Sequence, residues 1–321
     1  MTPLAVACLV SMALLTGFRR LAPRLGFMSA PNDRSAHTVS TPAGGGICFA
    51  LAALLGLFWA EPNAGLGGSY IATLQLGGLL VASVGLADDR FNLSPWSRLT
   101  FYLLASLLLA LQVFDVAHFI YLLSCVVAIT WVINLVNFMD GIDGFVVTQT
   151  LCVAMGMVTI AAFLPHTGSL IALNLTLAAA LLPFLWLNWP PASVFMGDSG
   201  SVFLGFYLAA MGIMAYRLEV ALGAVWLILM MPFFVDATAT LLARLYRGLP
   251  PHQAHSEHAY QRLARSVDSP LPINLGLLAI HGIWQFPCAV WAVYSSYSLL
   301  FPVIFSAIPS ILLVVSSRRY S

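Results

Sequence analysis

The chain has 321 residues, enough for two ordinary soluble domains, but its composition excludes that class of protein. Hydrophobic residues make up 60% of the sequence and charged residues only 8%, whereas soluble domains carry about 25% charged residues. All 13 basic residues are Arg and 12 residues are acidic, so the net charge of +1 gives no reason to expect a nucleic-acid partner. The sequence therefore predicts an integral membrane protein.

A helix needs about 20 mostly apolar residues to cross a hydrocarbon core of about 30 Å. The sequence contains about eleven such stretches, which predicts an all-α integral membrane protein with one polytopic domain over residues 1–321. No basic segment precedes the first stretch, which favours a retained span over a signal peptide. In chain order the predicted transmembrane helices are 2–18, 45–60, 70–87, 97–114, 117–136, 145–164, 168–187, 199–216, 219–240, 272–291 and 293–316.

The arginines predict the orientation, because positively charged loops tend to stay in the cytoplasm. With the N-terminus outside and the C-terminus cytoplasmic, only Arg217 of the 13 arginines lies outside. We therefore expect a multi-pass protein of the cell inner (cytoplasmic) membrane whose active site faces the cytoplasm. The expected active-site loops are 19–44, 88–98, 137–145, 188–199 and 241–271.

The third predicted span ends in GLADDRFNLSP, where Asp88 and Asp89 are adjacent carboxylates. Consecutive helical side chains point about 100° apart, so the two acids can serve different ligands. Two like charges at a membrane surface are costly without a cation, and Arg90 alone cannot balance both. A pair of solvated charges at a helix end is the alternative interpretation.

The segment NLVNFMDGIDG follows the fifth predicted span and contains Asp140 and Asp143, three residues apart. If the segment is helical, both acids share one face, and Asn137 lies about one turn earlier. Gly141 and Gly144 allow a ligand or another backbone to approach closely. A simple turn would account for the glycines but not for two carboxylates with neighbouring amides.

The segment NWPPASVFMGDSGS places Asn188 and Asp198 on either side of a Pro-Pro break. We expect Asp198 at the N-terminus of the eighth span, where backbone N–H groups attract anions while the carboxylate can hold a divalent cation. A helix-capping role for Asp198 or Ser199 is compatible with that interpretation.

The longest inner loop, PPHQAHSEHAYQRLAR, repeats His252, His255 and His258 every three residues, and Arg262 follows. A short helix would present these side chains as one stripe. The pattern favours an anion-binding face over a zinc site, because no acidic or Cys ligand completes a recognisable zinc site. A plain surface helix is also open.

The first inner loop pairs Arg34 with His37 shortly before the three consecutive glycines 44–46. Exposed backbone N–H groups beside Arg and His suit the recognition of a phosphate group. Three glycines are equally compatible with a hinge or a close helix crossing.

Five acids from three separate inner loops would repel each other if they converged, and a bound cation would resolve that conflict. They are Asp88, Asp89, Asp140, Asp143 and Asp198. Hard oxygen ligands imply Mg²⁺, with Mn²⁺ as an alternative, and Mg²⁺ is usually held by one or two carboxylates together with substrate phosphates. The residues therefore predict metal-dependent phosphate chemistry on a membrane lipid.

The motifs PNDRSAH, GLADDRFNLSP, NLVNFMDGIDG, NWPPASVFMGDSGS and AHSEHAYQRL resemble those of the polyprenyl-phosphate N-acetylhexosamine-1-phosphate transferase family, and they occur in family order over residues 31–263. The resemblance implies a phosphoglycosyltransferase that moves a sugar 1-phosphate from a UDP-N-acetylhexosamine to undecaprenyl phosphate and releases UMP. The segment HSEHAYQRL is more similar to members that initiate O-antigen in lipopolysaccharide biosynthesis than to muramoyl-pentapeptide transferases.

The residues and the resemblance together give the expected site. The expected metal ligands are Asp198 and Asp89. The expected catalytic residues are Asp88, Asp89, Asp140 and Asp143. The expected substrate-binding residues are Arg34, His37, Asn137, Asn188, His255, His258 and Arg262.

A lipid phosphate is largely dianionic at neutral pH, so it attacks without much help from a general base, which favours direct displacement over a two-step route. A homodimer is left open. The alternative function is a cation-coupled membrane transporter, although such sites usually lie near the bilayer midplane and here the acids lie at span ends.

Overall fold

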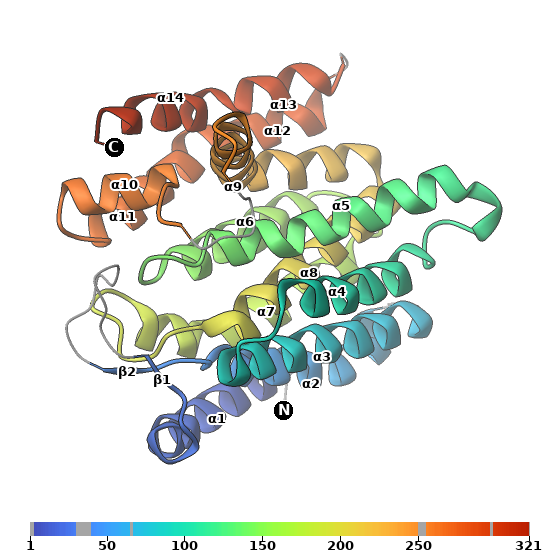
Figure 1. Ribbon diagram of the computed structural model, residues 1–321. Helices are drawn as coiled ribbons and strands as arrows, with labels where there is room; N and C mark the ends of the chain where they lie inside the picture. The colour runs from blue at the N-terminus through green and yellow to red at the C-terminus, as the bar shows by residue number, and fades with distance from the viewer. Residues whose placement is uncertain (1–2, 30–39, 65–66, 250–254, 296–297, 321) are drawn as a thin grey trace.

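The computed structural model describes residues 3–29, 40–64, 67–249, 255–295 and 298–320 (Figure 1). Within these residues the chain is helical apart from loops and one two-stranded antiparallel sheet, β1 (Met28–Ser29) and β2 (Thr41–Pro42). The expected all-α class is therefore confirmed.

Each predicted span contains a helix, but the first continues to Leu25, the ninth continues to Tyr246, and in the last the helix begins at Leu300 rather than at 293. Their bounds are α1 Pro3–Leu25, α2 Gly46–Ala64, α3 Gly68–Phe91, α4 Pro95–Ala110, α5 Phe119–Phe138, α6 Phe145–Ala161, α7 Gly168–Asn188, α8 Gly197–Leu218, α9 Val220–Tyr246, α10 Ala259–Ser266, α11 Leu271–Ile280, α12 Phe286–Tyr294, α13 Leu300–Ser306 and α14 Ile308–Ser317. Short 3₁₀ turns, Val116–His118 and Arg318–Tyr320, precede α5 and follow α14, and a π-helical turn, His281–Gln285, joins α11 to α12.

Among the described residues, eight helical segments, some made of two consecutive helices, are long and apolar enough to cross a membrane. They are α1, α3, α5 with its preceding turn, α7, α8, α9, the α11–α12 segment and the α13–α14 segment. The predicted spans 45–60, 97–114 and 145–164 are also helical, in α2, α4 and α6, but do not meet the same measure of length and hydropathy. The protein is thus an all-α, multi-pass membrane protein, while the count of eleven and the orientation stay predictions.

Helix α8 runs through the middle of the bundle and packs against α2, α3, α5, α7 and α9 (Figure 1). Its side chains Phe203, Phe206 and Tyr207 are completely buried. Lipid tails are as apolar as these side chains, so close van der Waals packing, rather than transfer out of water, stabilises such a helix in a membrane.

Glycines allow α2 and α3 to approach the first turn of α8. A Cβ atom on Gly46 would lie 2.2 Å from the Gly200 Cα atom, and one on Gly85 would lie 2.6 Å from the Asp198 carbonyl carbon. The amides of Gly45 and Gly46 donate to the carbonyl groups of Phe195 and Met196, so these glycines form a close crossing rather than an open phosphate cradle.

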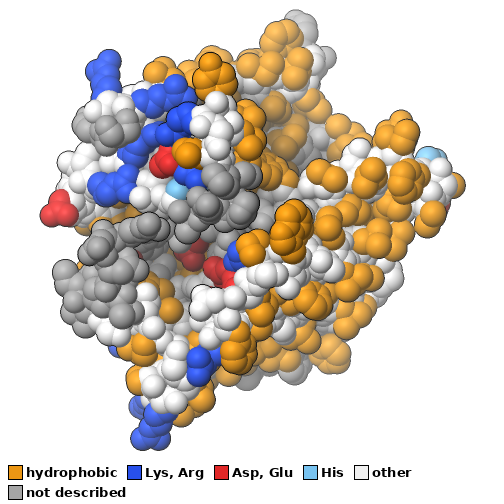
Figure 2. All heavy atoms as spheres, in the orientation of Figure 1, with side chains coloured by type: hydrophobic (Ala, Val, Ile, Leu, Met, Phe, Trp, Pro, Cys, Tyr) orange, Lys and Arg blue, Asp and Glu red, His pale blue; other side chains and the backbone are white. Residues whose placement is uncertain are grey.

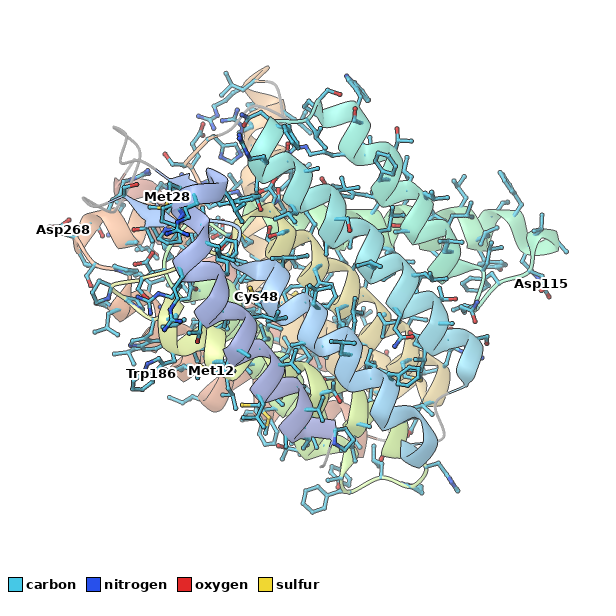
Figure 3. All side chains as sticks on the ribbon, turned by 90° about the horizontal axis from the view of Figure 1, so that it is seen from below. Met12, Met28, Cys48, Asp115, Trp186 and Asp268 are labelled. Carbon is cyan, nitrogen blue, oxygen red and sulfur yellow. The ribbon has the colours of Figure 1, made fainter. Side chains whose placement is uncertain are left out.

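The two ends of the bundle differ in chemistry. Met28 and Asp268 lie at one end and Asp115 at the opposite end (Figure 3). Basic and acidic side chains gather at the end that carries α10 and the C-terminus, around a hollow in which carboxylates are visible, while hydrophobic side chains cover much of the remaining face (Figure 2). We call the end with Met28 and Asp268 the charged end.

The substitution Gly46→Ala is expected to lower the thermal unfolding temperature of the purified protein, because the new Cβ would clash with backbone atoms of α8. Overpacking of this kind costs about 1–3 kcal/mol of unfolding free energy. Gly17→Ala in α1 is the control, since a Cβ there meets nothing within 4 Å. Equal unfolding temperatures for the two variants would contradict the tight crossing.

Candidate active site

Four helix ends meet at the charged end and bring together polar motifs that are far apart in the sequence. Asp88 lies in the last turn of α3 and Asp198 in the first turn of α8. The Arg98 guanidinium, at the start of α4, donates to Asp88 and also to Asp198 Oδ2 at 3.0 Å. Asn137, at the end of α5, donates to Asp198 Oδ1 at 3.0 Å. We call these four residues, with Asp89, the acidic cluster.

The turn between α3 and α4 explains the position of Arg98. Asn92 ends α3 in the left-handed region with φ of 51°, and the backbone N–H of Leu93 donates to Asp88 Oδ1 at 2.7 Å. Ser94 then caps α4 with its side chain. From the sequence, Arg98 is one of the arginines expected on the inner side, at the end of the loop 88–98. Ser94 and Pro95 form a helix-start signal just before Arg98. This signal is the feature of the sequence that indicates a turn bringing Arg98 back toward Asp88.

Asp89 caps helix α8 from helix α3. Its Oδ1 accepts the backbone N–H of Asp198 at 2.7 Å and its Oδ2 accepts that of Ser199 at 3.1 Å. Gly197 has φ of 71°, and a Cβ there would lie 2.6 Å from Asp89 Oδ2. Both oxygens of this expected metal ligand therefore already satisfy the N-terminus of α8, where the helix dipole favours a negative charge.

The segment after α5 is tied to the loop before α8 through Asn188 and Asp143. Asn188 Oδ1 accepts the Gly144 N–H at 3.0 Å, and its Nδ2 donates to the Val194 carbonyl at 2.9 Å. Asp143 Oδ2 accepts the Ala192 N–H at 2.9 Å. The structure thus gives Asn188 a bridging role between two loops that both carry expected site residues.

The carboxylate of Asp140, unlike those of Asp89, Asp143 and Asp198, accepts no hydrogen bond from the described residues. Burial raises the pKa of Asp140 to about 7, and the charges of Asp89 and Asp143 act in the same direction. A nearby cation would favour the charged form and reverse that shift.

Helix α10 is capped in the same way as α8. Asp236 of α9 accepts the backbone N–H groups of Ala259 and Tyr260 at 2.9 and 3.1 Å. Its Oδ1 also lies 3.4 Å from Nδ1 of His258, which is buried, and the half-buried His255 ring stacks on His258 at 4.9 Å between centroids. The histidine-bearing segment is therefore fixed by a buried carboxylate.

Helix α10 also contacts the acidic loop that follows α5. The Tyr260 hydroxyl donates to the Phe138 carbonyl at 3.3 Å, and a Cβ on Gly141 would lie 2.3 Å from the Gln261 side chain. The histidine segment and the NFMDGIDG segment therefore form adjoining walls of one site.

Burial, together with nearby positive charge, keeps the His255 ring neutral. Burial lowers the pKa of His255 to about 4, assisted by the charges of His258 and Arg244. Glu257 pairs with Arg244 at 2.5 Å and with Arg247. Partial burial opposes the ionisation of Glu257, but its hydrogen bond to Arg247 and the arginine charges hold its pKa below the ordinary value. His255 can therefore exchange hydrogen bonds with a ligand near pH 7 but adds no positive charge.

The remaining expected residues lie elsewhere. Arg34, His37 and His252 are outside the described residues. Arg262 donates to the Ser317 hydroxyl at 3.1 Å and so contacts α14. The structure thus brings together the acids, Asn137 and the two described histidines at one end of the bundle, and it turns the Arg262 guanidinium toward another helix.

The described residues contain no group of three or more His, Cys, Asp or Glu side chains arranged to hold a metal ion. The idea that a cation alone relieves the repulsion between the acids is therefore incomplete, because Arg98 and the N-terminus of α8 already compensate three of them. The Asp140 carboxylate accepts no hydrogen bond from the described residues, and each Asp198 oxygen accepts one, so these acids retain lone pairs of the hard oxygen type that suits Mg²⁺. Such a small set suits an ion whose other ligands are substrate phosphates.

Comparison with known proteins agrees with these motifs. The model of Glycosyl transferase family 4 matches residues 71–216, from α3 to α8. A phospho-N-acetylmuramoyl-pentapeptide-transferase of Gluconacetobacter diazotrophicus is 31% identical over 66% of this chain and 70% of the relative. The chain belongs to the polyprenyl-phosphate N-acetylhexosamine-1-phosphate transferase family. It is a phosphoglycosyltransferase, and the transporter alternative is not favoured.

Two further relatives differ in the lipid that their names state. A probable undecaprenyl-phosphate N-acetylglucosaminyl 1-phosphate transferase of Bacillus subtilis is 25% identical over 80% of this chain and 75% of its own length. A decaprenyl-phosphate N-acetylglucosaminephosphotransferase of Mycobacterium tuberculosis is 30% identical over 65% of this chain and 60% of its own length.

The substitution Asp89→Asn is expected to lower the thermal unfolding temperature even in EDTA, because the amide has one oxygen with which to accept the two N–H groups of α8. Losing such a cap costs about 1–2 kcal/mol. The matched control is Asp115→Asn at the opposite end, where the side chain makes no cap hydrogen bond. An unfolding temperature unchanged by Asp89→Asn in EDTA would contradict the capping role.

Proposed function

We propose that this protein transfers an N-acetylhexosamine 1-phosphate from a UDP-sugar to undecaprenyl phosphate and releases UMP. The observation that carries the proposal is the acidic cluster, in which Arg98 joins Asp88 to Asp198 beside Asp140, whose carboxylate accepts no hydrogen bond from the described residues. Membership of the family and the names of the relatives, which act on undecaprenyl or decaprenyl phosphate, support the lipid acceptor and the sugar-phosphate donor.

In the proposed reaction an oxygen of the lipid phosphate attacks the β-phosphorus of the UDP-sugar. A new P–O bond forms there, and the bond from the β-phosphorus to the oxygen bridging the two phosphates breaks. UMP leaves with that bridging oxygen, and the product is a polyprenyl diphosphate sugar. The attacking phosphate is already largely dianionic, so no side chain is required to remove a proton.

The chain's own residues orient the groups that meet in this step. Arg98 and Asn137 fix both oxygens of Asp198, so this carboxylate has one orientation. Asp89 fixes the start of α8 on which Asp198 stands. The neutral His255 belongs to the adjoining wall, from which it is proposed to donate a hydrogen bond to the diphosphate or the sugar.

We further propose that Asp198 and Asp140 hold Mg²⁺, with Mn²⁺ as an alternative, and that Asp89 acts by positioning α8. When bound, the ion lowers the repulsion between the two phosphate-bearing substrates and stabilises the leaving phosphate. The role given to Asp140 follows from its carboxylate, which accepts no hydrogen bond from the described residues.

The site is proposed to face the cytoplasm from the inner membrane, because the charged end collects the arginine-rich segments and sugar nucleotides are cytoplasmic substrates. We propose that the product initiates an O-antigen-type surface glycan, on the basis of the HSEHAYQRL segment.

A direct test incubates purified protein with undecaprenyl phosphate, Mg²⁺ and a panel of UDP-N-acetylhexosamines and measures released UMP. At least one donor is expected to give UMP, and EDTA is expected to abolish its release. Asp198→Asn is expected to reduce turnover at least a hundredfold, whereas Asp115→Asn keeps it. UMP release that persists in Asp198→Asn, or in excess EDTA, would contradict the proposed site.

Replacing the cluster's arginine tests the orientation of Asp198. Arg98→Gln leaves Asp88 and Asp198 without their shared cation, so kcat is expected to fall about 10–100-fold, which corresponds to about 1.4–2.7 kcal/mol. Arg90→Gln is the control, because Arg90 is exposed and its guanidinium lies over the Phe91 ring. A kcat that falls equally in both variants would assign the effect to net charge rather than to the bridge.

A further inference from the structure

An apolar cavity of about 200 Å³ lies between α9, α10, α11 and α14, and its inner wall includes Met139 and Tyr260, next to the acidic loop. Its wall is mostly aliphatic, with Ile273, Leu277, Leu313 and Val314 among the lining residues. Ser310, in the same wall, is buried, and its hydroxyl has no hydrogen-bond partner among the described residues. A cavity of this size and chemistry accepts part of a hydrocarbon chain.

A small cationic hollow lies next to this cavity. Three arginines line it, namely Arg247, Arg262 and Arg318, together with one acid, Glu257. Val314 lines both the hollow and the apolar cavity, so the two spaces share a wall. The hollow's volume of about 20 Å³ accommodates one water-sized group, which is the size of a single phosphate oxygen.

Glu257 is the acid that lines the hollow, and it pairs with Arg244 and Arg247. The Nε atom of Arg262 is buried and has no hydrogen-bond partner among the described residues. Burial lowers the pKa of Arg262, and the charge of Arg318 lowers it further against the opposing effect of Asp236. A bound anion would satisfy the Nε donor and separate the two like charges.

This hollow is on a different face of α10 from the reaction site. Gln261 packs against Gly141 of the acidic loop, whereas the next residue, Arg262, reaches Ser317 of α14. Consecutive helical side chains point about 100° apart, so an anion held by Arg262 and Arg318 does not occupy the acidic cluster.

We propose that the cationic hollow and the apolar cavity together bind one anionic phospholipid, with its phosphate against Arg262 and Arg318 and part of an acyl chain in the cavity. The α13–α14 segment is a candidate membrane span that ends at Ser317, so Arg318 stands where a lipid headgroup lies. Basic pockets between transmembrane helices on the cytoplasmic side recognise anionic headgroups. Binding of this lipid does not require the transferase reaction, although the cavity shares Tyr260 with the wall of the candidate active site.

The test measures binding rather than turnover, so it succeeds or fails separately from the proposed function. Detergent-solubilised protein is titrated with phosphatidylglycerol or phosphatidylcholine, and retained lipid is counted by native mass spectrometry. Wild-type protein is expected to retain phosphatidylglycerol in preference to phosphatidylcholine. Arg318→Gln is expected to weaken phosphatidylglycerol binding about fivefold, as an arginine near a membrane surface contributes about 1 kcal/mol. Arg319→Gln, at the adjacent exposed position, is the control and is expected to bind normally.

A second pair of variants tests the acyl-chain cavity. Gly276 lines the cavity and a Cβ there meets nothing within 4 Å, so Gly276→Leu is chosen to place a side chain in the space. It is expected to weaken phosphatidylglycerol binding, whereas Gly17→Leu, equally unhindered on α1, is not. Wild-type binding by both Arg318→Gln and Gly276→Leu would overturn the proposal. Complete displacement of phosphatidylglycerol by inorganic phosphate, with Gly276→Leu binding normally, would overturn the lipid assignment in favour of a free anion.

Discussion

The charged end depends on one type of interaction, in which a carboxylate from one transmembrane helix caps the N-terminus of another segment. Asp89 accepts two N–H groups of α8, and Asp236 accepts two N–H groups of α10. Burying a carboxylate or an unpaired helix terminus costs several kcal/mol, and bringing the two together removes both costs. The positions of Asp198 in the first turn of α8 and of His258 before α10 follow from these two caps.

The acids in this region consequently have different functions, although the sequence presents them as similar. Asp88 and Asp89 are held by Arg98 and by backbone N–H groups, and they fix helix ends. Asp143 accepts a backbone N–H group of the neighbouring loop. The carboxylate of Asp140 accepts no hydrogen bond from the described residues and is therefore the one with the most remaining capacity for a ligand. The hydrogen bonds of each carboxylate are needed to tell structural acids from reactive ones, because the spacing of the acids along the chain does not distinguish the two kinds.

Much of this organisation was accessible from the sequence. Hydropathy located the helices, and the end positions of the acidic motifs predicted that they would meet at one end of the bundle. The sequence could not show that Asp89 caps α8, because the contact depends on a crossing that Gly85 and Gly197 permit. Arg98 was missed as a site residue for a related reason. Its role follows from a three-residue turn between two helices, and the hydrophobic pattern of α4 gives no indication of its partner.

The charge balance of the cluster explains why a divalent cation belongs in the proposed reaction. Within the described residues, Arg98 is the arginine bonded to the acidic cluster, whereas Arg244 and Arg247 pair with Glu257 and Arg262 contacts α14. One guanidinium among several carboxylates leaves the region negative before any substrate arrives. A lipid phosphate and a diphosphate add more negative charge at short distance, and their repulsion grows as the surroundings become less polar. Hydrogen bonds from Asn137 and the neutral His255 orient such groups but do not neutralise them. This balance is the reason for proposing that positive charge enters with the substrates, as Mg²⁺ commonly does at phosphate sites that offer one or two carboxylates.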